Sequence, residues 1–175
     1  MIKPKVLAAA GLVALSALAG IAPAGADDGH GRHHRDGAKL RFEEFVGVST
    51  SELGAAGAIR GVNGGGAPWS IGEARVTVRR SGRVDVRFED LIFTGGPNAG
   101  KNTVSPMAVV LTCLDRSGNP AKAVSQPFAV TVGDGVDIGG DADARTTITV
   151  PEVCKDPIAL ITNGTGLAWF AKSGR

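Results

Sequence analysis

The sequence is poor in aromatic side chains. It contains no tyrosine, and its 175 residues include only two tryptophans and six phenylalanines. Proteins that hold sugars or partner proteins through ring contacts present exposed, rigid aromatic side chains for that purpose. A binding surface built mainly from stacked rings is therefore not indicated.

Histidine is absent from position 40 onward. All three histidines lie in the segment DDGHGRHHRDG, as His30, His33 and His34. A Ser-His-Asp or Cys-His catalytic site needs an imidazole within hydrogen-bond reach of its nucleophile. In a domain that begins near position 40, the imidazole could come only from the preceding tail. The sequence therefore does not favour a hydrolase of either type.

The chain also lacks an apolar run long enough to span a membrane. Lys3 and Lys5 precede an apolar segment at 6–21, and Ala24-Gly25-Ala26 supplies the small residues of a signal-peptidase site. A spanning helix needs about 20 apolar residues. The pattern predicts a secretory signal peptide over residues 1–26 and no membrane insertion after its cleavage.

Excess charge of one sign is missing. The predicted leader holds two of the 19 basic residues and none of the 17 acidic ones, so residues 27–175 carry no formal net charge. Such a protein lacks the long-range field that attracts polyphosphate backbones. We therefore expect no nucleic acid among its partners. The length that remains is that of one domain.

Cysteine occurs only twice, as Cys113 and Cys154. Export would place both where disulfides form and persist, so the pair predicts one intramolecular bridge. The two cysteines are 41 residues apart in the sequence. Closing a loop of about that length stabilises a fold by roughly 4 kcal/mol in the chain-entropy model. The alternative, a thiol nucleophile or metal ligand, is disfavoured because no histidine lies in the same part of the sequence.

Helical periodicity is almost absent, and the best window, residues 50–59, is weakened by Gly54 and Gly57. Residues 27–39 are polar and predict a disordered, His-rich leader.

From residue 40 to 175, short apolar runs alternate with turn-forming residues. This pattern indicates an all-β fold, a single antiparallel β-sandwich of jelly-roll or Ig-like type, or alternatively a β-barrel. Besides the two regions described next, strands are expected at 40–48, 58–62, 121–132, 144–150, 158–162 and 167–171.

The clearest pair of strands is expected between residues 73 and 93, where apolar and charged side chains alternate on both sides of Arg80-Ser81-Gly82-Arg83. This predicts a β-hairpin with one dry and one wet face. Two registers remain open. Cross-strand charge favours Val78 opposite Val86, whereas Gly82 at the end of a three-residue loop favours Val78 opposite Val84.

One further stretch resembles a nucleotide-binding motif without fulfilling it. LIFTGGPNAGKNT, residues 91–103, has a Gly-x4-Gly-Lys-like spacing that is one residue short of a P-loop, and Asn102 stands where the magnesium-binding hydroxyl is needed. The following MAVVLTCL, residues 107–114, is apolar on both faces and predicts a central strand instead of a helix. We therefore interpret residues 95–102 as a long loop between strands and expect no nucleotide.

Two segments could hold a metal ion. The tail histidines His30, His33 and His34 could bind zinc, copper or nickel weakly. The segment GDGVDIGGDADA could offer carboxylates to calcium, although it lacks the EF-hand spacing. Its aspartates are Asp134, Asp137, Asp141 and Asp143. In both cases the alternative is a solvated segment without a metal.

Candidate ligand contacts lie in two loops. Trp69 follows Pro68 in the run GVNGGGAPWSIG, where an indole could stack on a sugar or anchor a partner, although the scarcity of aromatic residues favours a role in capping the core. Asn98 and Asn102 lie in the loop 95–102. Trp169, within LAWFA, is expected in the core.

These observations favour a secreted, non-enzymatic binding module without a cofactor, associated with the cell envelope and contacting an unknown protein or envelope polymer. In its leader, single cysteine pair and Gly-rich strands the chain resembles small secreted proteins of high-GC bacteria, a likeness of composition that implies no activity. Two alternatives stay open. One is an extracellular protein that binds calcium, zinc or copper, and the other is a hydrolase that uses carboxylates alone.

Overall fold

The computed structural model describes residues 39–174. The predicted signal peptide and the three histidines of the leader lie outside this part of the chain. Within residues 39–174, no helix is long and apolar enough to cross a membrane. The described residues form an all-β fold, and the sandwich predicted from the sequence is confirmed, with sheets that are not closed into a barrel.

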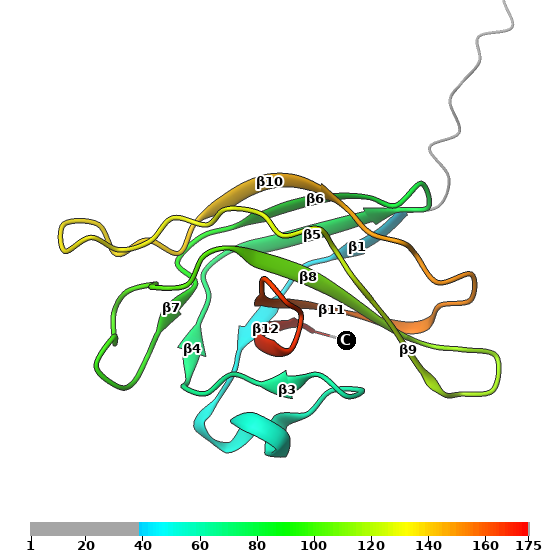
Figure 1. Ribbon diagram of the computed structural model, residues 1–175, viewed down its shortest axis with the longest axis horizontal. Helices are drawn as coiled ribbons and strands as arrows, with labels where there is room; N and C mark the ends of the chain where they lie inside the picture. The colour runs from blue at the N-terminus through cyan, green and yellow to red at the C-terminus, as the bar shows by residue number, and fades with distance from the viewer. Residues whose placement is uncertain (1–38, 175) are drawn as a thin grey trace, which may run out of the picture. The chain divides into compact units, whose positions relative to one another are not determined.

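Two antiparallel sheets build the sandwich (Figure 1). The four-stranded sheet has the order β1-β5-β6-β10, and its strands are Lys39–Phe42, Ala74–Arg79, Arg83–Phe88 and Ala142–Thr147. The six-stranded sheet has the order β2-β12-β11-β8-β9, and its strands are Phe45–Gly47, Ala168–Ser173, Lys155–Asn163, Met107–Leu114 and Pro120–Val124. Its sixth strand, β3 (Asn63–Gly64), pairs in parallel with β12. A short pair, β4 (Trp69–Ser70) and β7 (Ile92–Phe93), lies beside them.

The hydrophobic core fills the space between the two sheets. Val76, Val86 and Phe88 face it from the four-stranded sheet, and Leu111 and Ile161 face it from the six-stranded one, all almost completely buried. Burial of this kind is the main favourable contribution to folding, at about 25 cal/mol for each Å² of apolar surface removed from water. Because every second side chain of β5 and β6 is buried in this core, the side chains between them point outward.

The hairpin of β5 and β6 is confirmed, and Val78 lies opposite Val84. Gly82 has φ +86° and donates its backbone N–H to the Arg79 carbonyl at 2.8 Å, which closes a three-residue loop. The register favoured by cross-strand charge is therefore wrong. The backbone of Gly82 settles the register because a left-handed φ costs glycine little.

The strand predicted at 107–114 is confirmed as β8, which lies between β11 and β9. Seven of its eight residues are buried, as expected for a strand covered on both faces. The stretch at 95–102 is the loop between β7 and β8, as interpreted from the sequence, and a strand follows it where a P-loop would require a helix.

Some predicted elements differ from those observed. Residues 58–62 form a tight turn in place of a strand, because Arg60 and Gly61 both have positive φ. The strand predicted at 121–132 ends at Val124, and beyond it Phe128 and Val132 make only isolated bridges. The best helical window contains two short 3-10 turns, η1 (Thr50–Glu52) and η2 (Gly54–Gly57).

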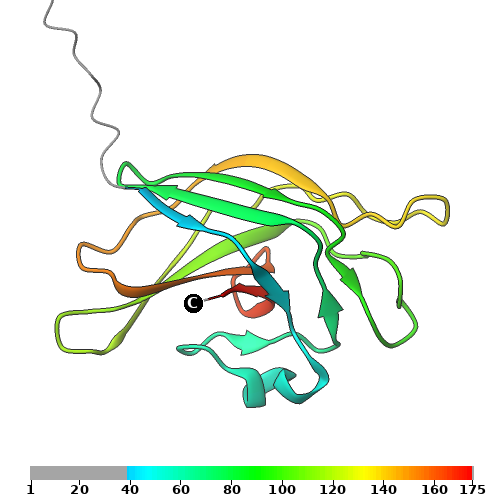
Figure 2. The same ribbon diagram turned by 180° about the vertical axis from the view of Figure 1, so that it is seen from behind.

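Residues 48–68, which we call the covering segment, lie over the outer face of the six-stranded sheet (Figure 1). Trp169 on β12 donates its indole N–H to the Gly57 carbonyl at 2.8 Å, and Lys172 forms an ion pair with Glu52. Arg60 of the same segment donates to the Thr112 carbonyl on β8, and Leu160, on the outward side of β11, is fully buried. The covering segment is reached through β1 and β2, consecutive strands that pass from one sheet to the other at Glu44, which has φ +57° (Figure 2).

The predicted disulfide joins Cys113 to Cys154, with their Cα atoms 4.7 Å apart. Cys113 is fully buried on β8, and Cys154 precedes β11. The bridge therefore links the residue that directly precedes β11 to the neighbouring strand β8. The bridge closes a loop over a sequence separation of 41 residues. This is the loop length on which the predicted stabilisation rests.

Candidate functional site

The contacts predicted from the loops are largely buried. Trp69 is 4% exposed and packs between Phe93 and Phe170, at ring-centroid distances of 3.8 and 4.4 Å. Asn102 is fully buried, and its amide donates to the backbone carbonyls of Val104 and Thr131. Trp69 thus belongs to the core, as the alternative predicted, and Asn102 holds loops together. Of the three proposed contacts, only the half-buried Asn98 has access to solvent.

The acidic loop projects beyond the sheets (Figure 1), and two of its aspartates accept hydrogen bonds from backbone N–H groups. Asp134 accepts hydrogen bonds from the backbone N–H groups of Val136 and Asp137, and these bonds lower its pKa. Asp141 accepts one from the N–H of Asp90 at 3.0 Å. Asp143 lies on β10, outside the loop. Across residues 39–174, no three His, Cys, Asp or Glu side chains gather closely enough to hold a metal ion. His30, His33 and His34 lie outside the described residues.

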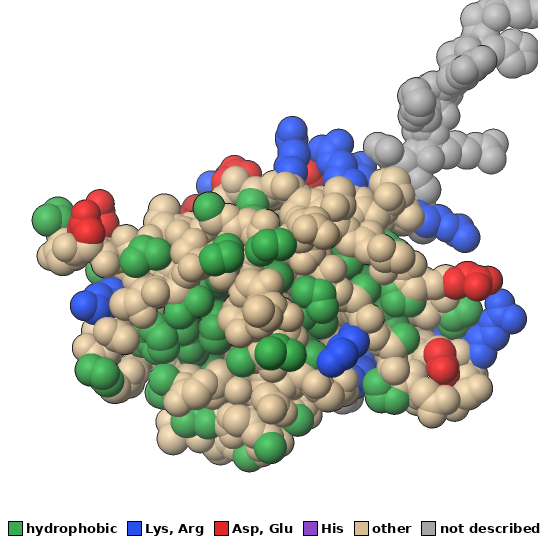
Figure 3. Space-filling model, in the orientation of Figure 1, with side chains coloured by type: hydrophobic (Ala, Val, Ile, Leu, Met, Phe, Trp, Pro, Cys, Tyr) green, Lys and Arg blue, Asp and Glu red, His purple; other side chains and the backbone are tan. Residues whose placement is uncertain are grey.

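Charged side chains gather instead on the outer face of the four-stranded sheet, which we call the arginine face (Figure 3). The alternation that turns valines into the core turns these side chains toward solvent. Six are basic and five are acidic. The basic ones are Arg41, Arg75, Arg79, Arg83, Arg87 and Arg145, and the acidic ones are Glu43, Glu73, Asp85, Glu89 and Asp143.

Strand pairing sets the order of these charges across the sheet. Arg75 on β5 lies opposite Arg87 on β6, which lies opposite Asp143 on β10. In the next row of outward-facing residues, Asp85 lies opposite Arg145. The wet face of the hairpin was predicted from the sequence. The addition of β10 beside it was not, because β10 follows β6 by more than 50 residues in the chain.

Asp85 is the centre of the largest charge cluster. Its carboxylate accepts ion pairs from Arg83 at 3.1 Å, Arg145 at 3.3 Å and Arg79 at 3.4 Å. Partial desolvation raises the pKa of Asp85, but hydrogen bonds and charge from Arg83 and Arg79 outweigh it, so the pKa lies below its ordinary value. One negative charge thus holds three guanidinium groups in place while leaving their combined charge positive.

A second carboxylate is shared in the same way. Glu43 pairs with Arg41 at 2.7 Å and with Arg75 at 2.9 Å, and hydrogen bonds from these two arginines lower the pKa of Glu43. Arg87 pairs with Glu89 at 3.1 Å. The repulsion expected between Arg75 and Arg87 is therefore relieved because each has a carboxylate partner of its own.

A shallow groove of about 280 Å³ runs over this face. Its basic lining consists of Arg75, Arg79, Arg83, Arg87 and Arg145, with Asp85 and Asp143 among them. Guanidinium groups are planar donors whose geometry matches carboxylate and phosphate oxygens. The groove is therefore suited to hold anionic groups spaced along an extended ligand.

Two carboxylates of this face line a second depression of about 210 Å³. They are Glu73 and Glu89, and Arg75 and Arg87 line the depression with them. Glu89 accepts a hydrogen bond from Arg87 at 3.1 Å. This part of the face therefore presents carboxylate and guanidinium groups side by side.

No protein-family model, curated protein or solved structure matches the chain. Only the chemistry of its own residues can indicate a function.

Proposed function

We propose that the protein is an exported, non-enzymatic binding module that holds a linear acidic polysaccharide of the cell envelope on its arginine face. The observation that carries this proposal is the concentration of six arginines on one face, against five carboxylates. A ligand with regularly repeated carboxylate or phosphate groups complements such a surface. Recognition by charge also needs no aromatic platform, in keeping with the scarcity of aromatic residues.

The distribution of charge over the whole domain supports this choice. Residues 39–174 contain 14 basic and 14 acidic residues, so their formal net charge is zero. The arginine face alone carries +1, which leaves −1 for the remainder. A local field of this kind orients an anionic ligand toward one surface without making the whole protein attractive to every polyanion.

The spacing of the arginines suits a polymer. Outward side chains repeat about every 6.6 Å along a strand, and neighbouring strands are about 4.8 Å apart. Arg83 and Arg87 on β6 and Arg145 on β10 therefore present several donor groups over a surface longer than one sugar unit. Asp85 positions two of these three guanidinium groups in advance, which lowers the entropy lost on binding.

The cellular setting is part of the proposal. The disulfide between Cys113 and Cys154 is typical of proteins in oxidising compartments, and the predicted leader directs export. The acidic polymers of a cell envelope would then be among the polyanions that the arginine face meets.

Titration calorimetry of disulfide-intact residues 27–175 with polygalacturonate, a linear polymer with one carboxylate per sugar, tests the proposal. We expect binding that weakens at least tenfold between about 50 and about 200 mM salt, because each ion pair displaces counterions. The triple variant Arg83→Gln, Arg87→Gln, Arg145→Gln should weaken binding by a further factor of about ten or more.

Arg116→Gln is the matched control, because Arg116 is 79% exposed and lies in the turn after β8, away from the arginine face. It should bind like the wild type. Equal binding by the triple variant, or equal binding of neutral dextran, would contradict the proposal. Tighter binding of duplex DNA than of polygalacturonate would show that the face recognises nucleic acid instead.

A further inference from the structure

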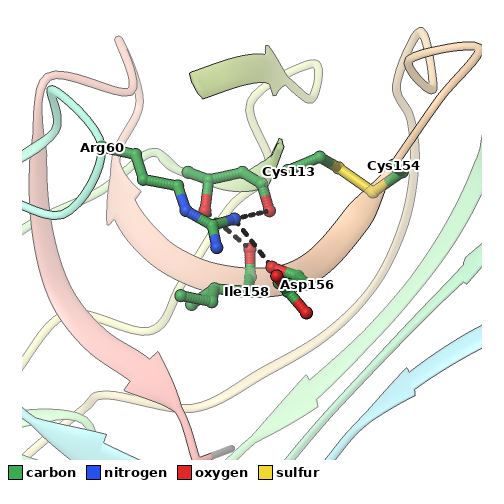
Figure 4. The surroundings of a disulfide bond; sticks show 6 residues. Arg60, Cys113, Cys154, Asp156 and Ile158 are labelled. Carbon is green, nitrogen blue, oxygen red and sulfur yellow. Dashed lines mark hydrogen bonds between the residues drawn. A yellow bond between two sulfur atoms is a disulfide. The ribbon is translucent and has the colours of Figure 1, made fainter. Parts of the chain in front are cut away.

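A larger pocket lies away from the arginine face. It has a volume of about 520 Å³ and is lined by Arg60, Leu114, Asp156, Pro157 and Ile158. The disulfide lies close to it, since Leu114 and Asp156 are each within two residues of a bridged cysteine (Figure 4). Pockets of about 300 to 1,000 Å³ with apolar walls and a few polar groups are typical of small-molecule sites.

Two irregular pieces of backbone create this pocket. Arg60 belongs to the tight turn at 58–62 and has φ +50°. Asp156 lies in an irregularity of β11, between Lys155 and Ile158, and has φ +46°. These are two of the four non-glycine residues with positive φ in residues 39–174. Such backbone costs energy and tends to be concentrated at functional sites.

The guanidinium of Arg60 is fixed in position and only partly used. Its Nη1 donates to the Asp156 carbonyl at 2.7 Å and to the Thr112 carbonyl at 3.1 Å, between β11 and β8 (Figure 4). Arginine has five N–H donors. Among the described residues, Nε and Nη2 of Arg60 have no acceptor, so these atoms can donate to a carboxylate in the pocket.

The carboxylate of Asp156 is equally unused. It is exposed and has no hydrogen bond or ion pair with any residue between 39 and 174. Arg60 contacts the backbone carbonyl of Asp156 and leaves its side chain unpaired. The pocket therefore offers one positive and one negative group that do not neutralise each other.

The remaining wall is apolar. Leu114, Pro157 and Ile158 line it with aliphatic carbon atoms, and Leu114 and Ile158 are partly buried. An apolar side chain of a ligand would gain about 25 cal/mol for each Å² that it buries against this wall.

From these three features we infer that the pocket binds a free L-amino acid with an aliphatic side chain. Arg60 receives the α-carboxylate, Asp156 receives the α-ammonium group, and the aliphatic wall receives the side chain. A simple carboxylic acid would leave Asp156 facing an anion, and a simple amine would leave Arg60 without an acceptor. This site is independent of the arginine face, so either could exist without the other.

L-Leucine is the probe for this inference, with N-acetyl-L-leucine and L-leucinamide as analogues that each lack one charge. Titration of the wild-type protein, followed by two-dimensional NMR, should shift the amide signals of residues 60, 114, 156 and 158. We expect L-leucine to bind at least about tenfold more tightly than either analogue, since each loses one charge-assisted hydrogen bond.

Two variants locate the charges. Asp156→Asn keeps a residue type that tolerates positive φ and should weaken L-leucine at least about tenfold while leaving N-acetyl-L-leucine unchanged. Arg60→Gln should weaken L-leucine and leave L-leucinamide unchanged. If Arg60→Gln fails to fold, Asp156→Asn and the wild-type NMR map still decide the matter. Arg83→Gln is the control and should bind L-leucine normally.

Three results would overturn the inference. The first is the absence of saturable L-leucine binding to the wild type. The second is binding that shifts signals elsewhere in the domain. The third is equal affinity for L-leucine and N-acetyl-L-leucine that Asp156→Asn does not change.

Discussion

The outer faces of the two sheets differ in what covers them. On the four-stranded sheet the outward side chains of β5 and β6 are charged, except for Thr77, and are in contact with solvent. On the six-stranded sheet the outward side of β8 and β11 is buried under the covering segment. The same pleated backbone thus supports a wet, basic surface in one case and a second dry interface in the other. The difference comes from the sequence pattern, which alternates in β5 and β6 and is continuously apolar in β8.

The largest expected effect on stability is seen when an aspartate is placed on the outer face of each sheet in two separate variants. Leu160 is fully buried on β11, and its neighbour Lys172 on β12 contacts the covering segment. Leu160→Asp should destabilise the fold by at least about 4 kcal/mol, because a carboxylate buried in an apolar site is costly and the ammonium group of Lys172 is already paired with Glu52. Urea unfolding followed by circular dichroism measures the change.

Thr147→Asp is the matched substitution on the other sheet. Thr147 is exposed on β10 and lies opposite Arg83. The free energy of unfolding should change by no more than about 0.5 kcal/mol, as for most surface substitutions. Similar losses in both variants would show that the two outer faces do not differ as described.

A smaller effect tests how the covering segment is attached. Trp169→Phe removes the indole N–H that binds the Gly57 carbonyl, whereas Trp69→Phe removes an indole N–H that has no partner within residues 39–174. The Gly57 carbonyl would lose its donor in the first variant only. We therefore expect Trp169→Phe to cost about 1 kcal/mol more than Trp69→Phe in chemical unfolding. Equal costs would mean that this hydrogen bond does not hold the covering segment.

The smallest effect concerns the exposed face and pH. Asp85 has a folded-state pKa below its ordinary value of 3.8, so its stabilising contribution is present above that value and is lost as pH falls through the folded pKa. Asp85→Asn should lower stability at pH 7 by about 0.5 kcal/mol or less, since partly exposed ion pairs contribute little. The difference from wild type should shrink as the pH falls below 3.8 and the Asp85 carboxylate becomes protonated. A difference that persists in acid would indicate a packing role for Asp85.

Much of the fold could be predicted because local pattern and burial agree. The hairpin, the central strand β8, the disulfide and the loop at 95–102 follow from alternation, apolar runs and turn residues. The register of the hairpin required a choice between charge and Gly82. The charge argument failed because the partner of Arg75 is Glu43, which is 32 residues away in the chain and shows no local signal.

The binding surfaces were less predictable. Asn102 looked like a loop contact, yet its amide bonds to Thr131, a residue that no sequence spacing connects with it. The arginine face needs β10 next to β6, and the second pocket needs the turn at Arg60 next to the irregularity at Asp156. Each brings together segments more than 50 residues apart, so single-sequence patterns contain no information about them.

The disulfide also determines how the domain responds to a protease. Cys113 and Cys154 close a covalent ring that contains β9, the projecting acidic loop and β10, and so includes strands of both sheets. Val136 in that loop is 92% exposed and is therefore an accessible cleavage point. A cut there opens the ring without releasing either piece. The nicked chain keeps Arg145 tethered beside Asp85, and a reducing agent is needed before the fragments can separate.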